Sequence, residues 1–356
     1  MTPTRVIYYL LLLVPVAIWL ELSHASPVPI FIVSCLAILP LAGLMGEATE
    51  QLAHHAGPGI GGLLNATFGN AAELIIGFIA LRAGETEIVK ASLTGSILGN
   101  LLMVLGLAML VGGWKYKELV FNRLAAETGT GMMVLAVVAL VIPAIYAQVT
   151  EHRSPEHIES LSLDISMVLI VTYIASLVFQ FRTHDRLFAP EEGPDAEPEG
   201  HHGEIWSVSR SLLTLLGAAA AIGLVSEFLV GAVDAAGTSL GLGKVFMGVV
   251  VVAVVGNAAE HSTAIIVAKK GKMDLAFGIA MGSAMQIALF VAPALVIAGH
   301  LIGQPLGLEF TILEVSAVML SVVAVSFLVM NGRTNWFEGV QLLAIYAILA
   351  MTFYFI

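Results

Sequence analysis

The sequence carries little charge for its length. Asp, Glu, Lys and Arg make up 12% of the 356 residues, whereas hydrophobic residues make up 58%. Soluble domains carry about 25% charged residues, so this composition excludes an ordinary soluble globular protein. The 15 basic residues form no stripe along the chain, and nucleic-acid binding is therefore not expected.

Cysteine is nearly absent as well. Cys35 is the only one, so no disulfide can form within the chain, and a thiolate site for a soft metal is not indicated. Cys35 lies in an apolar run, where a small buried core residue is the simplest interpretation.

Apolar runs fill the chain instead, each close to the roughly 20 residues that span a bilayer. The sequence predicts an all-α polytopic membrane protein with 11 transmembrane helices. Their approximate ranges are 6–22, 28–49, 59–82, 87–111, 125–147, 162–181, 207–231, 242–268, 273–302, 310–330 and 337–356.

The distribution of Lys and Arg predicts the orientation of these helices. With a cytoplasmic N-terminus, eleven of the 15 basic residues fall on the cytoplasmic side, and the other side holds only Arg82, Lys90, Arg153 and Lys244. Cytoplasmic loops are enriched in Lys and Arg, so this orientation is favoured. The compact loops are typical of a bacterial protein, and we expect a multi-pass protein of the cell (inner) membrane.

A pentapeptide in the sequence occurs twice. Gly-Asn-Ala-Ala-Glu stands at Gly69–Glu73 and again, 187 residues later, at Gly256–Glu260. A Gly-Ser pair follows each copy at the same spacing, at Gly95–Ser96 and Gly282–Ser283. The chain is therefore expected to hold two repeats of five helices after an unpaired first helix. Because five is odd, the second repeat enters the membrane from the opposite side, and such inverted repeats are a transporter architecture.

Four regions follow from this duplication. Residues 1–27 hold the first helix, 28–181 the first repeat, 182–206 an acidic cytosolic linker and 207–356 the second repeat. Within the linker, Pro190–Glu204 carries six acids, three prolines and two histidines. This composition is typical of a disordered, solvated linker. A regulatory segment that senses cations is the alternative.

Each repeated motif places a carboxylate inside a membrane helix. Asn70 and Glu73, like Asn257 and Glu260, are three residues apart and share one helix face. A buried membrane carboxylate is costly and is a functional-site hypothesis by default. Carboxylate, amide and carbonyl oxygens suit Ca²⁺, which takes six to eight oxygen ligands. Without the cation, two bare carboxylates would be costly there, so protons are expected to replace it.

Neutral oxygen donors on neighbouring helices are candidates for a supporting shell. Ser96 and Asn100 are four residues apart, and Ser283 and Gln286 are three apart, so each pair shares a face. Ordinary interhelical hydrogen bonding is the alternative role for these four residues and for the two motif asparagines.

Two acids near helix ends, Glu50 and Glu227, occupy matched positions in the two repeats. They are candidates for a cation path or a gate, and solvated helix ends are the alternative. A purely structural role for Glu73 and Glu260 is disfavoured, since neither motif helix carries Lys or Arg near its centre.

Leu64–Ile76 and Val254–His261 resemble the two signature repeats of the cation/proton exchanger branch of the cation/Ca²⁺ exchanger superfamily. Gly95–Asn100 and Gly282–Gln286 are similar to its accompanying helix motifs. The resemblance covers the chain from about Phe31 to the C-terminus. The related Na⁺/Ca²⁺ exchanger branch has more hydroxyl residues around the glutamates and an acid in an accompanying helix, where this chain has Asn and Gln.

The resemblance implies a Ca²⁺/H⁺ antiporter that exports cytosolic Ca²⁺ by alternating access, with Ca²⁺ as substrate and no cofactor. It places Glu73 and Glu260 at the central site, with Asn70 and Asn257 beside them. It also implies that the helices at 28–49 and 207–231 are the mobile gating pair.

Other functions remain open at this point. Na⁺(K⁺)/H⁺ or Na⁺/Ca²⁺ exchange through the same site is the nearest alternative. An intramembrane metalloenzyme is less favoured, because none of the ten histidines belongs to a His-Glu-x-x-His pattern. A passive cation channel is the third alternative. Homo-oligomers are compatible with the sequence.

Overall fold

The computed structural model describes residues 9–149, 155–184 and 206–356. These residues are nearly all helical, and the two short strands among them, β1 (Leu119–Val120) and β2 (Arg333–Thr334), pair antiparallel. Nine helical stretches of the described part are long and apolar enough to cross a membrane. The chain is therefore a polytopic membrane protein, as its composition predicts.

The elements of the first half follow the apolar runs closely. They are α2 (Leu13–Leu22), α3 (Pro27–Phe68), α4 (Ala71–Arg82), α5 (Thr86–Leu98), the π-helical segment η1 (Gly99–Val104), α6 (Leu105–Lys115), α7 (Arg123–Val149), α8 (Pro155–Val178) and the π-helical segment η2 (Phe179–Thr183).

The second half has the same character. Its elements are α10 (Val208–Leu240), α11 (Lys244–Phe246), the π-helical segment η3 (Met247–Val252), α12 (Ala253–Lys269), α13 (Met273–Gln286), the π-helical segment η4 (Ile287–Val291), α14 (Ala292–Ile302), α15 (Ile312–Val329) and α16 (Trp336–Tyr354). Helix α10 continues to Leu240, past the predicted end near residue 231, because no helix breaker stands before Gly241.

Two of the predicted spans are not among the nine. The span at 6–22 begins in residues outside the described part, and its described helix, α2, is short. The span at 59–82 is divided where α3 ends at Phe68 and α4 starts at Ala71. The count of 11 therefore stays a prediction. Pro190–Glu204 and most of the predicted linker also lie outside the described residues.

Backbone irregularities divide the helices near the repeated motif. Gly57 has φ 79° and ψ 169°, which kinks α3 in a conformation that glycine adopts without steric cost. Asn70, with φ −101° and ψ 27°, separates α3 from α4. The second motif lies inside the continuous helix α12. The two copies of one pentapeptide thus have different backbones.

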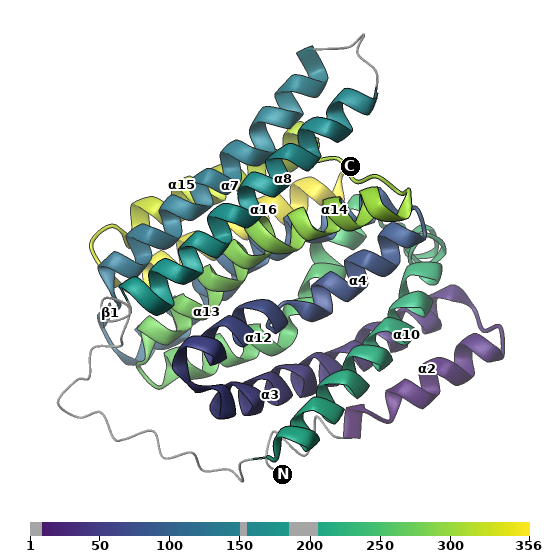
Figure 1. Cartoon of the computed structure of the whole chain (residues 1–356), viewed down its shortest axis with the longest axis horizontal. Coiled ribbons are helices and arrows are strands. Elements are labelled where there is room, and N and C mark those ends of the chain that lie inside the picture. The colour runs from purple at the N-terminus through teal and green to yellow at the C-terminus, as the bar shows by residue number, and fades with distance from the viewer. Residues whose placement is uncertain (1–8, 150–154, 185–205) are drawn as a thin grey trace.

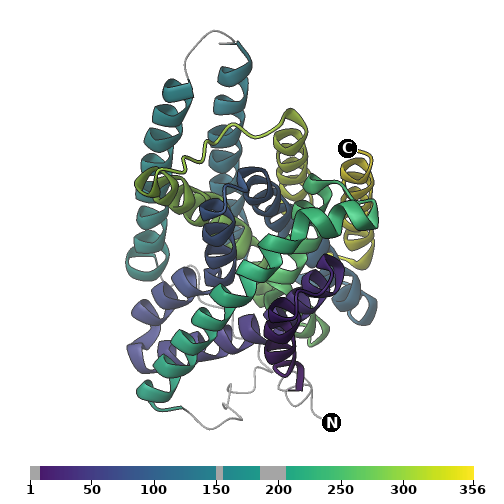
Figure 2. The same ribbon diagram turned by 90° about the vertical axis from the view of Figure 1, so that its right-hand side faces the viewer.

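The helices form three groups across the bundle. Figure 1 shows α2, α3 and α10 along one edge, with α4, α12 and α13 between them and the group α7, α8, α14, α15 and α16. Helices α2, α3 and α10 contact one another, as do α7 and α15, and α8 and α14. In Figure 2, turned by 90°, α7 and α8 extend beyond the rest of the bundle. The motif helices α4 and α12 therefore lie in the middle of the molecule.

Candidate functional site

The two motif glutamates approach the molecular centre from different helices. Glu73 lies in the first turn of α4, where the free N–H groups and the helix dipole favour a negative charge. Glu260 lies within α12. Helices α4 and α12 are in contact, so segments far apart in sequence bring the two carboxylates to one region.

Each glutamate lies against the glycine of the other motif. A Cβ atom added at Gly69 would lie 3.4 Å from Glu260 Oε1, and one added at Gly256 would lie 3.4 Å from Glu73 Oε1. The arrangement is reciprocal, because position 1 of each pentapeptide meets position 5 of the other. The glycines therefore provide the space in which both carboxylates come together.

The motif asparagines are held by serines from the accompanying helices. Asn70 and Asn257 are each only 1% exposed. Asn257 Nδ2 donates a hydrogen bond to Ser96 Oγ at 2.9 Å, and Ser283 Oγ donates to Asn70 Oδ1 at 2.9 Å. These two bonds are also reciprocal, since each asparagine of one repeat pairs with the serine of the other.

The remaining two predicted supporting residues complete the polar network. Asn100 Nδ2 lies 3.0 Å from Ser283 Oγ and 3.3 Å from Asn257 Oδ1, and it donates to both. Asn70 Nδ2 donates to Gln286 Oε1 at 2.5 Å. The structure thus brings all four predicted supporting residues into contact with the motif asparagines. The network fixes the asparagine amides beside the glutamates.

Some carboxylate oxygens have no protein partner. Among the described residues, Glu73 Oε2 and Glu260 Oε2 are buried and accept no hydrogen bond, and the same holds for Asn100 Oδ1. Neither glutamate forms an ion pair with a Lys, Arg or His of the described chain. A buried carboxylate without a partner is costly, so its natural counter-ion is a metal cation or a proton from outside the protein.

A small pocket gives access to one of the carboxylates. It is lined by Glu73, Ile76, Ser92, Leu93, Ser96, Val252, Ala253 and Gly256. Most of its wall is apolar, and Glu73 supplies its only carboxylate. The side chains of Glu73 and Glu260 are themselves partly exposed rather than sealed in the core.

The packing around the site differs between the two repeats. A Cβ at Gly95 on α5 would lie 2.0 Å from the carbonyl oxygen of Val249 on η3, so these segments pack backbone to backbone. At the matching Gly282 on α13, an added Cβ would meet nothing within 4 Å. One side of the site is therefore closed by tight helix packing, and the matching side is open.

His261 follows Glu260 directly but takes no part in this network. Its side chain is 8% exposed, and its Cε1 atom lies 4.0 Å from a Cβ position built on Gly99. This location fits the packing role expected from the sequence. Within the described residues, no three His, Cys, Asp or Glu side chains gather as a metal cluster, which gives no support to a zinc enzyme.

The matched acids Glu50 and Glu227 lie away from the central pair, and both are exposed. Glu227 on α10 forms an ion pair with Arg82, the last residue of α4. Sequence patterns did not single out Arg82, which counted only as a loop charge. Its signal is positional: Arg82 and Lys269 are 187 residues apart, the spacing of the repeat.

Comparisons with known proteins cover nearly the whole chain. Residues 26–182 and 210–355 match the sequence model of a family described as sodium/calcium exchanger protein. A Ca²⁺/H⁺ antiporter from Aphanothece halophytica is 43% identical, over 98% of this chain and 96% of its own. The Ca²⁺/H⁺ antiporter ChaA of Bacillus subtilis (strain 168) is 44% identical, over 96% of each chain. The solved structure of native YfkE has a TM-score of 0.84 at 39% identity, covering 98% of this chain and 100% of that one.

Proposed function

This chain belongs to the sodium/calcium exchanger protein family, and we propose that it is a Ca²⁺/H⁺ antiporter that exports cytosolic Ca²⁺ in exchange for protons. The observation that carries the proposal is the pair of reciprocal glutamates without a basic partner. The resemblance drawn from the two motifs is confirmed, and the antiporter relatives support the same activity. A family of antiporters is a family of transporters, not of enzymes.

The chemistry of exchange follows from the two carboxylates, Glu73 and Glu260. Together they neutralise one Ca²⁺, and the amide oxygens of Asn70 and Asn257 are the nearest neutral oxygen donors. Asn70 Oδ1 already accepts from Ser283, but an amide oxygen has a second lone pair for a cation. Ser96, Asn100, Ser283 and Gln286 position these amides. Once Ca²⁺ leaves, protons neutralise the same oxygens, so one site serves both substrates in turn.

The proposed architecture is a first helix followed by two inverted five-helix repeats, at 28–181 and 207–356. The reciprocal glycine and serine contacts support it. So do paired backbone features: Gly84 and Gly271, 187 residues apart, have φ of 81° and 83°, and the π-helical segments η1 and η4 begin at nearly the same spacing. A central site between inverted repeats is the arrangement of many secondary transporters.

Alternating access is the proposed transport mechanism. The tight contact of Gly95 with Val249 and the open space at Gly282 support a state in which the site is open toward one face only. Exchange of these two packings between the repeats would open the site to the other face. Helices α3 and α10, which pack along each other at the edge of the bundle (Figure 1), are the proposed mobile pair.

The protein is a multi-pass membrane protein with bacterial relatives. We place it in the cell (inner) membrane with a cytoplasmic N-terminus, on the distribution of Lys and Arg. In this orientation the closed packing at Gly95 faces outward and the site is open to the cytoplasm.

Ion competition in everted membrane vesicles tests the proposed substrate. A pH gradient is set up, and Ca²⁺, Na⁺ or K⁺ is added in turn. We expect Ca²⁺ to dissipate the gradient and the monovalent ions to have little effect, because a monovalent ion leaves one glutamate charge uncompensated. Dissipation by Na⁺ or K⁺ with no response to Ca²⁺ would overturn the assignment.

A further inference from the structure

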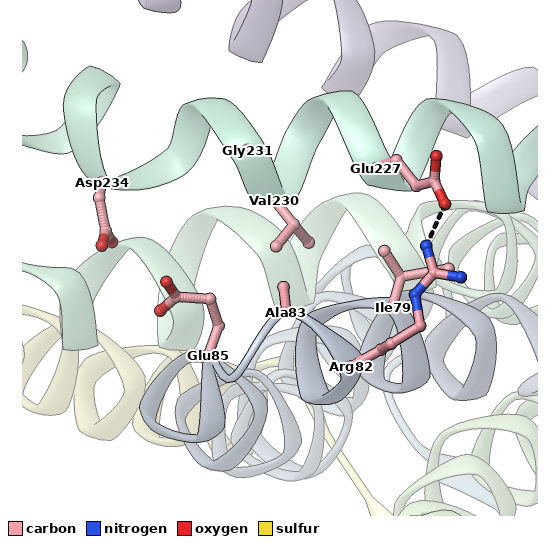
Figure 3. Close-up of a pocket in the computed structure, with 8 residues that line it drawn as sticks. All are labelled: Ile79, Arg82, Ala83, Glu85, Glu227, Val230, Gly231 and Asp234. Atoms are coloured by element: carbon pink, nitrogen blue, oxygen red, sulfur yellow. Dashed lines mark hydrogen bonds and ion pairs between the residues drawn. The ribbon is translucent and has the colours of Figure 1, made fainter. Parts of the chain in front are cut away.

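An ion pair closes a pocket at one end of the α4–α10 contact. The pocket has a volume of about 330 Å³ and is lined by Ile79, Arg82, Ala83, Glu85, Glu227, Val230, Gly231 and Asp234. Figure 3 shows the Arg82 side chain reaching from the end of α4 to Glu227 on α10, with Glu85 and Asp234 further along the same pocket. Arg82 therefore ties a motif helix to a proposed mobile helix.

The repeat gives this ion pair a counterpart. Arg82 ends α4 and Lys269 ends α12, each nine residues after its motif glutamate. The register is secured two residues further on, where Gly84 and Gly271 both have positive φ. The counterpart of Arg82 is thus a second basic residue at the end of the second motif helix.

Glu227 also has an acidic counterpart in Glu50. Gly223 and Gly46 stand four residues before these two acids, and the buried Ser226 and Thr49 directly precede them. Helix α3, which carries Glu50, packs against α12, just as α10 packs against α4. The inverted repeats therefore place a Glu–Lys pair at the opposite end of the site from Glu227–Arg82.

The two pairs are in different states in this structure. Arg82 and Glu227 are bonded, although their side chains are 60% and 45% exposed. Glu50 and Lys269 are both exposed, and they form no ion pair among the described residues. The bonded pair lies in the same contact region as the closed packing, since α4, α5 and α10 to α12 meet there.

We propose that Arg82–Glu227 and Lys269–Glu50 are two alternating gates, one for each end of the transport path, and that only one is bonded at a time. In the opposite state, Lys269 bonds to Glu50 while Arg82 releases Glu227. Once released, Glu227 faces the pocket with Glu85 and Asp234 and leaves it more negative, which favours a leaving or arriving cation. Exposed ion pairs are individually weak, which suits contacts that break in every cycle.

This proposal rests on the proposed function, and charge reversal in reconstituted full-length protein tests it. Arg82→Glu or Glu227→Arg alone places like charges together at the gate, and we expect each to slow exchange at least tenfold. The double variant Arg82→Glu/Glu227→Arg should recover most of the rate. The same pattern is expected for Lys269→Glu, Glu50→Lys and their double variant.

The control is an ion pair of similar exposure away from the path. Arg333 bonds to Glu118 at 3.1 Å, with side chains 61% and 57% exposed. Arg333→Glu should leave the exchange rate unchanged. Single reversals at either proposed gate that also leave the rate unchanged, or doubles that recover nothing although they fold, would refute the gates.

Tethering tests the alternation directly. In a Cys35→Ala background, Arg82→Cys/Glu227→Cys and, separately, Glu50→Cys/Lys269→Cys are bridged by a cleavable bifunctional thiol reagent. Each bridge should block exchange, and a reductant should restore it. Excess Ca²⁺ on either side should change the bridging yields of the two pairs in opposite directions. Exchange at the untethered rate through a bridged protein, or yields that move together, would overturn the proposal.

The proposed function and the gates can fail separately. If the untethered Cys35→Ala protein shows no Ca²⁺/H⁺ exchange while the parent chain also shows none, the function is wrong. If the parent exchanges Ca²⁺ for protons and bridged proteins do so equally well, only the gates are wrong.

Discussion

Two carboxylates and two amides, held by a small set of hydroxyl and amide side chains, make up the centre of this molecule. Glu73 and Glu260 each rest on a glycine of the other motif. Asn70 and Asn257 each bond to a serine of the other repeat. No basic residue of the described chain neutralises the carboxylates. At this scale, the site is one that requires a cation or protons.

Ser283→Ala tests the supporting network. Ser283 Oγ donates to Asn70 Oδ1 and accepts from Asn100 Nδ2, so its loss leaves buried polar atoms without partners. We expect the free energy of unfolding to fall by about 1–3 kcal/mol, together with weaker Ca²⁺ binding. Thermal unfolding in detergent and a Ca²⁺ titration measure the two effects.

Ser166→Ala is the matched control. Ser166 is equally buried, but its hydroxyl donates to the Ser162 carbonyl oxygen within α8. Its replacement should change neither quantity much. Equal effects of the two variants on Ca²⁺ binding would contradict a supporting role for Ser283.

At the scale of helices, the two repeats differ in how tightly they pack around the site. Helix α5 packs backbone to backbone against η3 at Gly95, whereas α13 leaves space at the matching Gly282. The first motif stands at a break between α3 and α4, and the second lies in a continuous helix. These differences separate one state of an exchanger from its opposite.

Gly95→Ala and Gly282→Ala form a matched pair of helix variants. At Gly95 the new Cβ would lie 2.0 Å from the Val249 carbonyl oxygen, so α5 and η3 must move apart. Such overpacking costs about 1–3 kcal/mol. At Gly282 nothing opposes the methyl group, and alanine favours the helix by up to about 1 kcal/mol.

Thermal unfolding in detergent compares the two variants. We expect a lower midpoint for Gly95→Ala and an unchanged or slightly raised midpoint for Gly282→Ala. The opposite order, or equal midpoints, would contradict the packing asymmetry.

At the scale of the whole molecule, the account rests on competition between Ca²⁺ and protons for two glutamates. If Ca²⁺ binding displaces protons from the carboxylates, its apparent affinity must rise with pH. When both glutamates are protonated, the logarithm of the affinity should rise with a slope approaching two. Glu73→Gln removes one titrating group and should reduce this slope to about one.

Calorimetric Ca²⁺ titrations over a range of pH measure these slopes. Glu309→Gln is the control, since Glu309 pairs with Lys90 elsewhere in the fold. This variant should keep the parent's slope. An affinity that does not change with pH would refute the competition.

Much of this architecture is readable from the sequence. The apolar runs predict the helices, because membrane spans need unbroken apolar length, and the predicted range 273–302 coincides with α13, η4 and α14 together. The spacing of 187 residues predicts which side chains meet. Ser96, Asn100, Ser283 and Gln286 were chosen for their helical spacing and oxygen atoms alone, and all four contact the motif asparagines.

Other features depend on tertiary packing and are absent from local patterns. Identical pentapeptides cannot show that one motif stands at a helix break and the other in a continuous helix. The difference arises from their surroundings, such as the kink at Gly57. The bond between Arg82 and Glu227 joins residues 145 apart in the chain, so charge counting along loops did not find it.

The central claim is that Glu73 and Glu260 together exchange Ca²⁺ for protons, and it is tested most directly by Ca²⁺ uptake driven by a pH gradient into liposomes holding purified protein. Parent protein, Glu73→Gln and Glu260→Gln are compared, with Glu309→Gln as the control. Losing one charged ligand is worth about 1.5–3 kcal/mol, so each site variant should lose at least about tenfold in uptake. The control should match the parent. Uptake at the parent rate by either site variant would contradict the account.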